Sequence, residues 1–418
     1  MKKSFNYIAI SAILLIIGYA CSKEVQFRTQ NTSALSPTNK DENAGTWKTL
    51  LLNAPDEVSV PAPIAVTTPE YIAQINEIKS WQKNMSAEEK NSVKYWSAGA
   101  VMRWNEIMRE LVSKYNLPPY QNPDGTYPAP NANNPLAYPY FPFANPPFAS
   151  RAYAYVSAAQ YDAIVAAYHY KQLFKRAAPY KTDATIHTLI PQSDLPSYPS
   201  EDAVIAGAAA EMLKLMFPGE QDFVNKKLEE HKRARLLAGV NVRSDIEAGE
   251  ALGRAVAQKF VARARTDRAG VSGGNPAMWK KLEDDCIARG ETPWYSLEVP
   301  RRPPMLPAFG VVKSLLHDSM TLVSLRPGPP PAVNSEKMAE ETDEIYQIVT
   351  NPTREQIAIV HLWADGVGTS TPPGHWNEIA AEDWIKENYS EARWARNMAL
   401  LNIALMDAAI VCWDTKMF

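Results

Sequence analysis

Residues 353–418, TREQIAIVHLWADGVGTSTPPGHWNEIAAEDWIKENYSEARWARNMALLNIALMDAAIVCWDTKMF, decide the fold because they repeat the pattern of residues 86–171. At a shift of 267 positions the matching pairs are Ser86 with Thr353, Glu88 with Glu355, Val93 with Val360, Trp96 with Trp363 and Gly99 with Gly366. At a shift of 245 they are Arg151 with Arg396, Ala154 with Ala399, Asp162 with Asp407, Ala163 with Ala408, Tyr168 with Trp413 and Lys171 with Lys416. A repeat of this length predicts two related helical bundles in one chain.

The two shifts differ because the first copy carries a proline-rich insert, PPYQNPDGTYPAPNANNPLAYPYFPFANPP, residues 118–147. Proline fixes φ and has no amide hydrogen, so we expect an extended surface loop there. The first copy continues for about ninety residues past Lys171, whereas the second ends two residues after Lys416. We therefore expect the second bundle to be incomplete and the chain to be cut short.

Short local signals predict the helices. Ser86 and Thr353 each stand three positions before a Glu or Gln, the spacing of a capping box that satisfies the free amides of a helix start. Ser244 predicts a third such start, Ser200 can cap a further helix, and residues 335–349 have a helical pattern. No convincing β-hairpin signal is present, so the expected fold is all-α, with proline-rich loops joining two related bundles.

These signals divide the chain. The first bundle is expected over residues 46–265, an ordered proline-rich connector over 266–335, and the start of the second bundle over 336–418. Residues 22–45 are polar and predict a flexible tether.

Residues 1–21 resemble a bacterial lipoprotein signal peptide. Lys2 and Lys3 precede a short apolar run at residues 8–17, and Cys21 stands where such a protein is lipidated. Gly18 departs from the usual leucine, so cleavage as a plain secreted protein stays open, as does a retained anchor. No later stretch is expected to span a membrane.

The composition excludes some classes of partner. The 418 residues carry a net charge of -3, so no basic field is available to attract nucleic acid. Apart from Cys21, the cysteines are Cys286 and Cys412, and their spacing suggests neither a metal site nor a disulfide framework.

The run WADGVGTSTPPGHWNEIA at residues 363–380, followed by ARNMALLNIALMDAAIVCWDTK at residues 395–416, resembles the vanadium-dependent haloperoxidases of the type 2 phosphatidic acid phosphatase superfamily. The resemblance implies two helical bundles and a site built from three motifs, K-x6-R-P, P-S-G-H and S-R-x5-H-x3-D. In that site Lys and Arg neutralise phosphate or vanadate oxygens, to which Ser and Gly donate hydrogen bonds. The His attacks phosphorus or binds vanadium, and the Asp orients it.

The first copy contains these motifs in eroded form. The motif positions that match are Lys171, Ser200, Arg235 and Asp245. The positions that differ hold Ala178, Glu201, Asp202 and Asn241, the last in place of the histidine, while Arg176 lies two residues out of register. Like charges about 4 Å apart repel by several kcal/mol in a partly buried site, so Glu201 and Asp202 would oppose an oxyanion.

Because Asn241 cannot act as the nitrogen nucleophile, we interpret the first copy as a structural pseudo-site. Its remaining charged residues are then expected to form an internal ion-pair network. They are Lys171, Arg235, Glu201, Asp202 and Asp245.

In the second copy, Lys416 matches the first lysine of K-x6-R-P, so the resemblance makes it a candidate for binding the vanadate cofactor or a phosphate ester. The alternative is a solvated charge near the end of the sequence. His361, Asp365 and His375 are candidate metal ligands, since the first two are four residues apart and can share a helix face. The alternative is that His375 caps or hydrogen-bonds the next helix.

The resemblance implies that a complete parent hydrolyses phosphate esters or uses vanadate and peroxide to oxidise halide, while this chain lacks the catalytic motifs. The expected location is a bacterial membrane, reached through a lipid anchor and facing the periplasm or the cell surface. Two alternatives stay open: a non-catalytic lipoprotein that binds a partner or ligand at the cell surface, and a chain whose missing segment comes from another polypeptide.

Overall fold

A computed structural model describes residues 29, 31–117, 122–124, 144–297 and 301–418. The chain forms two compact units, Met1–Thr32 and Ser33–Phe418. The predicted signal peptide, its Cys21 and most of the proline-rich insert lie outside the described residues.

The fold is all-α, with 63% helix and no strand in the described parts of the chain. The elements are η1 (Glu42–Thr46), α2 (Pro69–Gln82), α3 (Ala87–Trp96), α4 (Ala100–Tyr115), α5 (Pro146–Phe174), α6 (Pro179–Thr182), α7 (Glu201–Met216), η2 (Pro218–Glu220), α8 (Gln221–Leu237), α9 (Arg243–Ala264), η3 (Ala269–Val271), α10 (Pro276–Ala288), η4 (Phe309–Val311), α11 (Ser319–Ser324), α12 (Glu336–Thr350), α13 (Arg354–Trp363), α14 (Thr371–Glu387) and α15 (Glu391–Met417).

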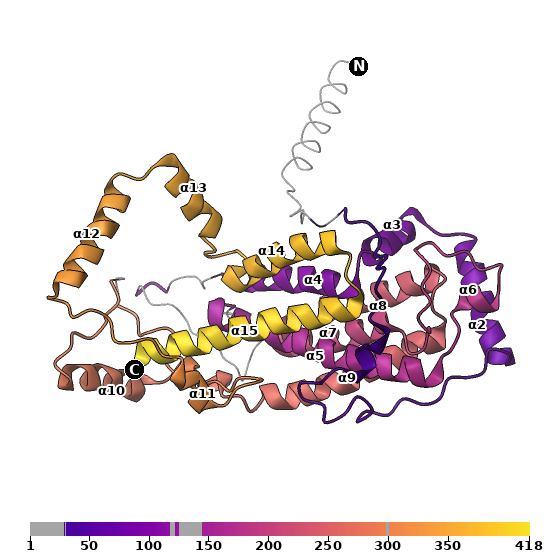
Figure 1. Cartoon of the computed structure of the whole chain (residues 1–418), viewed down its shortest axis with the longest axis horizontal. Coiled ribbons are helices and arrows are strands. Elements are labelled where there is room, and N and C mark those ends of the chain that lie inside the picture. Colours follow the sequence, from indigo (N-terminus) through magenta and orange to yellow (C-terminus); the bar gives the residue numbers. More distant parts are fainter. Residues whose placement is uncertain (1–28, 30, 118–121, 125–143, 298–300) are drawn as a thin grey trace, which may run out of the picture. The chain divides into compact units, whose positions relative to one another are not determined.

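Helix α5 is the centre of the first bundle, and its residues are buried along nearly the whole helix. It contacts α7, α9 and α15, and Figure 1 shows α15 running along it. Helices α7 and α9 approach closely because α9 presents glycines to the backbone of α7. A Cβ added to Gly249 would lie 2.5 Å from Ser200 O, and one added to Gly253 would lie 2.1 Å from Val204 O. This approach brings the starts of the two helices together.

Three pairs of helix starts recur at the two shifts found in the sequence. The N-cap residues Thr68 of α2 and Ser335 of α12 differ by 267 positions, as do Ser86 of α3 and Thr353 of α13, while Asn145 of α5 and Ser390 of α15 differ by 245. Both Ser86 and Thr353 form the expected capping boxes. The third expected box was misplaced, because α9 begins at Arg243 and the Asp245 carboxylate accepts from the amide of Val242.

Two further pairs of similar stretches, which the sequence analysis missed, recur at different shifts of 272 and 265 positions. WNEI occurs at residues 104–107 on α4 and again at 376–379 on α14, and GTWKTLL at 45–51 resembles GVVKSLL at 310–316. A Cβ added to Gly45 would lie 2.4 Å from His169 N, and one added to Gly310 would lie 2.4 Å from Asp414 Cα. His169 and Asp414 are themselves 245 positions apart, so each stretch packs at the same place on α5 or α15.

A buried polar cluster joins the two halves, and two of its contacts link residues at matching positions. Asn105 Nδ2 donates to Asn377 Oδ1 at 2.7 Å, and Asn402 Nδ2 donates to Ser157 Oγ at 2.9 Å. Asn377 and Asn402 also exchange two hydrogen bonds, at 2.6 and 2.9 Å. Buried amides are costly unless they are paired, so this cluster fixes how α4, α5, α14 and α15 meet.

The segments flanking the first bundle are held against it. Residues 42–45 lie in η1, although the sequence predicted a tether over 22–45, and Ala44 is fully buried. The Asp162 carboxylate accepts from the amides of Leu50, Leu51 and Leu52 at 2.7–3.0 Å. In the connector, Phe309 is fully buried within the main core.

Helices α12 and α13 differ from the rest of the second half, because neither contributes a buried residue. In Figure 1 they stand away from α14 and α15. By length and composition α15 could cross a membrane, contrary to expectation. In this structure it packs along α5, and Ala395, Met398, Ile403, Met406 and Ile410 are buried.

Candidate functional site

The residues that match the phosphatase-like motifs meet around the N-terminus of α7. Lys171 comes from the last turn of α5, Arg235 from the end of α8, and Asp245 from the first turn of α9. Ser200 caps α7 by accepting from the amide of Ala203. A cavity of about 110 Å³ opens beside them, with Glu201, Asp202, Arg235, Asn241, Ser390 and Glu391 in its lining.

Lys171 is neutralised by the first residue of α7. Its side chain is 1% exposed, and its Nζ lies 2.6 Å from Glu201 Oε2. The same ammonium donates to the carbonyl oxygen of Pro196. Glu201 also stands in the first turn of α7, where the helix dipole favours negative charge. This carboxylate therefore neutralises both the lysine and the positive end of the helix dipole, which would otherwise attract an oxyanion.

Asp202, the residue after Glu201, forms an ion pair with Arg235. Arg235 NH2 lies 3.2 Å from Asp202 Oδ2, and His231 Nε2 lies 3.3 Å from Asp202 Oδ1. Burial alone would raise the pKa of Asp202, but Arg235 and His231 hold that pKa below its usual value. Burial lowers the pKa of His231, although Asp202 opposes the shift. Asp202 is therefore ionised and fully engaged at neutral pH.

Asp245 pairs with an arginine that lies outside the motif register. Arg176 NH2 is 2.7 Å from Asp245 Oδ1, and both side chains are buried. Arg176 also donates to Ser244 Oγ at 2.8 Å, and this contact draws Ser244 away from the capping role that the sequence predicted. Burial raises the pKa of Asp245, and Arg176 opposes that shift.

Asn241 acts as a structural link. Its Oδ1 accepts from Ser200 Oγ at 3.2 Å and from Arg235 Nε at 3.3 Å. Its Nδ2 donates to Ser197 O at 3.0 Å. Every polar atom of this amide is used within the chain, and an amide nitrogen has no free lone pair for nucleophilic attack.

The expected ion-pair network is thus present, with Arg176 as an added member. Lys171, Arg235 and Arg176 each meet a carboxylate within 3.2 Å. A bound vanadate or phosphate would have to displace Glu201 and Asp202 from their cations while remaining close to both negative charges. The residues of the first copy therefore do not fit an oxyanion.

Glu391 lies on the same cavity and comes from the second half of the chain. Its two carboxyl oxygens accept from the amides of Ala100, at 2.5 Å, and Val101, at 3.2 Å, at the start of α4. Burial and the nearby Asp202 raise the pKa of Glu391 to about 8, although the two amides act in the opposite direction. Glu391 thus links α15 to α4 and to the charge network.

We expect Glu391→Gln to change the pH dependence of stability. The folded state keeps a proton on Glu391 up to about pH 8, whereas the unfolded chain loses it near the ordinary glutamate pKa of 4.5. The folded state therefore binds more protons within this window, so Glu391 makes stability fall as pH rises. Between pH 5 and pH 8 the wild type should lose on the order of a few kcal/mol more than the variant, measured by urea unfolding. Parallel pH profiles would contradict this.

Lys416 lies far from this network in sequence and has a different environment. Its Nζ lies 4.8 Å from the ring centroid of Trp413, and it lines a second cavity of about 770 Å³ with Trp279, Trp294, Arg301 and Arg302. Several cations and aromatic rings therefore surround it.

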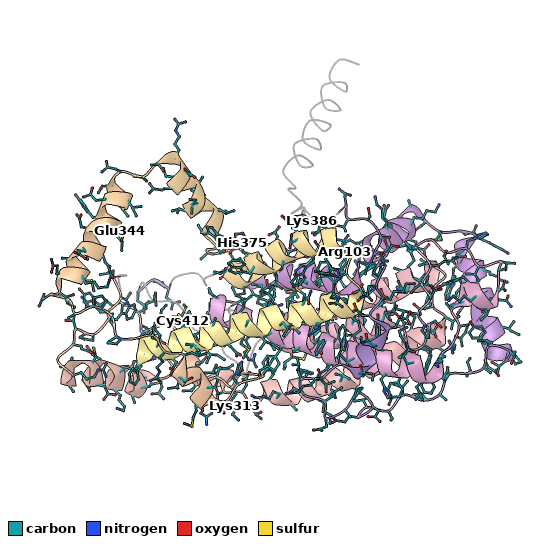
Figure 2. The ribbon with its side chains drawn as sticks, in the orientation of Figure 1. Arg103, Lys313, Glu344, His375, Lys386 and Cys412 are labelled. Carbon is teal, nitrogen blue, oxygen red and sulfur yellow. The ribbon has the colours of Figure 1, made fainter. Side chains whose placement is uncertain are left out.

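The three candidate metal ligands are only partly brought together. His375 Nδ1 lies 3.1 Å from Asp365 Oδ2, and Figure 2 shows His375 at the start of α14, near the end of α13. His361 is on α13, which buries none of its residues. No group of three or more His, Cys, Asp or Glu side chains in the described ranges could hold a metal ion. His375 lies within α14, and its hydrogen bond is to Asp365 in the preceding loop, not the cap or bond to the next helix that the alternative interpretation expected.

Sequence reasoning missed Glu391, His231 and the pairing of Arg176 with Asp245. Glu391 and His231 belong to none of the three motifs, and no local pattern marks them. The signal for Arg176 was its position within KQLFKRAAP, where it is the nearest arginine to the vacant motif position.

Comparison with solved structures finds similar helical proteins at low identity. The first bacterial vanadium-dependent iodoperoxidase to be solved is 16% identical, with a TM-score of 0.43, over 57% of this chain and 62% of that protein. An apo-type bacterial vanadium-dependent chloroperoxidase is 14% identical, with a TM-score of 0.40 and the same coverage. A transmembrane PAP2-type phosphatidylglycerolphosphate phosphatase from Bacillus subtilis is 11% identical, with a TM-score of 0.29, over 48% of this chain and 89% of that protein.

The chain therefore spans 62% of the length of each of these two haloperoxidases. No protein-family profile and no curated protein sequence matches the chain. Similarity at this level carries no assignment of site or activity.

Proposed function

We propose that the chain belongs to the superfamily of vanadium-dependent haloperoxidases and type 2 phosphatidic acid phosphatases, and that its first bundle is a non-catalytic scaffold. The membership is supported by the second-copy signature at residues 363–380 and 395–416. The loss of catalysis is supported above all by the buried pair of Lys171 and Glu201, in which the chain's own carboxylate replaces an external oxyanion.

Under this proposal a complete catalytic site would require the other motif residues around Lys416. A complete parent would hydrolyse phosphate esters or oxidise halide with vanadate and peroxide. The 418 residues supply neither the remaining arginines nor the histidine of the motifs around Lys416. The protein is placed at a bacterial membrane by lipidation of Cys21, facing the periplasm or the cell surface.

We expect the purified chain to be inactive in both reactions. With vanadate present, bromide oxidation by peroxide should equal that of the heat-denatured protein, and so should hydrolysis of p-nitrophenyl phosphate without vanadate. Vanadate titrated into the protein should show no saturable binding by calorimetry, because Glu201 and Asp202 already neutralise the first-bundle cations. Lys416→Ala should behave as the wild type.

If binding or activity is detected, the Lys171 and Lys416 variants show which part of the proposal is wrong. Saturable vanadate binding that Lys171→Met abolishes would show that the first bundle holds an oxyanion. Binding or turnover that Lys416→Ala abolishes would show that the second-copy lysine works without the remaining motifs. Either result contradicts part of the proposal.

A second candidate function is partner binding at the cell surface. The observation in its favour is that α12 and α13 bury no residue in this structure although both carry large apolar side chains. Contiguous exposed apolar surface of this kind marks interaction sites.

A further inference from the structure

The two halves of the chain each contain a pair of tryptophans in the same arrangement. In the first half the rings of Trp96 and Trp104 have centroids 5.7 Å apart and an interplanar angle of 43°. In the second half the rings of Trp363 and Trp376 have centroids 5.3 Å apart and an angle of 42°. One pair joins α3 to α4 and the other joins α13 to α14, so the pairs occupy matching places.

Helix α8 covers the first pair. His231 stacks on Trp96 with centroids 4.0 Å apart, and it accepts a hydrogen bond from Trp104 Nε1 at its Nδ1, at 3.2 Å. The adjacent Glu230 accepts from Trp96 Nε1 at 3.1 Å. Both indoles are consequently almost fully buried, at 1% and 0% exposed, with both N–H groups satisfied.

Within the described part of the chain the second pair is covered only in part, by the ring of His375, whose centroid lies 4.9 Å from that of Trp363. Trp363 and Trp376 are each 44% exposed, and Val360, which matches the buried Val93, is 64% exposed. The exposed apolar residues of α12 and α13 near this pair in sequence are Ile345, Tyr346, Ile348, Val349, Ile357, Ile359 and Leu362. The surface formed by α12, α13 and Trp376 is called the tryptophan face below.

We propose that the tryptophan face binds an amphipathic helix of the α8 type, carried by a partner polypeptide. The matching face of the first half shows what such a helix must provide. It needs adjacent glutamate and histidine side chains, as in Glu230 and His231, to accept from the two indole N–H groups. It also needs aliphatic side chains three and seven positions before the histidine, as at Leu228 and Val224, which are buried in the first bundle.

Charge distinguishes the two faces and narrows the choice of partner. On the first half, Arg233 of α8 pairs with Glu89 of α3 at 3.0 Å. At the matching position α13 has the neutral Gln356. An arginine at the position of Arg233 in the partner helix therefore forms no ion pair. The glutamate and histidine of that helix can still accept hydrogen bonds from the two indole N–H groups. The proposal concerns binding and does not depend on whether the chain is catalytic.

The test uses the full chain and a synthetic peptide with the sequence of α8, residues 221–237, labelled with a fluorophore. Fluorescence anisotropy should show saturable binding. Trp363→Ala and Trp376→Ala should each weaken it roughly tenfold or more, because central aromatic side chains carry most of an interface's affinity. A peptide with His231→Ala should weaken it similarly. Trp294→Ala, which removes another exposed indole outside the face, should leave binding unchanged.

Several results would overturn the proposal. Absence of saturation up to about 1 mM peptide would exclude a site of useful affinity. Equal binding by the Trp363, Trp376 and Trp294 variants would show non-specific attachment. A dimer in sedimentation experiments that Trp363→Ala abolishes would mean that a second copy of the chain covers the face, which also excludes the partner helix. Because Trp363 and Trp376 are exposed, their variants should keep the wild-type helical content, checked by circular dichroism.

Discussion

Replacing Lys171 by methionine is expected to destabilise the folded chain by about 3–5 kcal/mol, since removal of one partner leaves a charge buried without compensation. Lys171 is 1% exposed and Glu201 is 14% exposed, so water in the adjacent cavity can compensate only in part for the lost ammonium. The carbonyl of Pro196 also loses its donor. The measurement is the free energy of unfolding in urea at neutral pH.

A double variant separates the buried charge from the loss of packing. Lys171→Met combined with Glu201→Gln removes both charges, and it should recover most of the loss because a neutral pair needs no compensation. The matched control is Lys280→Met, which breaks an exposed pair with Asp284 and should change stability little, because solvent screens that pair. If Lys171→Met cost no more than this control, the ion-pair network would not be a stabilising core.

Gly253→Ala is expected to cost about 2–3 kcal/mol, the range for forcing extra volume into packed structure. The added Cβ would lie 2.1 Å from Val204 O and 2.9 Å from Ala208 N, both backbone atoms of α7 that no rotamer change can move. Helix α7 would have to move away from α9, carrying Glu201 and Asp202 with it. Thermal unfolding of the variant measures the loss.

Gly328→Ala is the control for this change. A Cβ at Gly328 meets nothing within 4 Å, so its effect should stay within about 0.5 kcal/mol. If Gly253→Ala were equally mild, the two helices would not be in the close contact that positions the site.

Features of the fold that depend on neighbouring residues could be predicted from sequence. The capping boxes at Ser86 and Thr353 and the cap at Ser200 are confirmed, because a side chain and an amide three residues apart need no tertiary contact to meet. The helix expected over 335–349 is α12, Glu336–Thr350. The all-α class followed from the same local signals.

Features that depend on tertiary contacts could not be predicted in this way. Ser244 has the spacing of a capping box, yet α9 begins before it because Arg176 takes its hydroxyl and Asp245 turns to the amide of Val242. Residues 42–45 have the composition of a tether, but Gly45 allows a close approach to α5 that composition cannot reveal. The repeat itself could have been extended from sequence, since WNEI recurs unchanged at 104–107 and 376–379.

The buried amide cluster has a consequence for how the chain is made. Asn105 meets Asn377, and Ser157 meets Asn402, so each contact joins residues more than 240 positions apart. Synthesis proceeds from the N-terminus, and α5 is therefore complete long before α15 exists to cover it. During that interval the face of α5 that α15 later covers, together with the side chain of Asn105, has no partner. We expect the first half to fold to its final form only after α14 and α15 have been synthesised, so the nascent chain needs protection from aggregation until then.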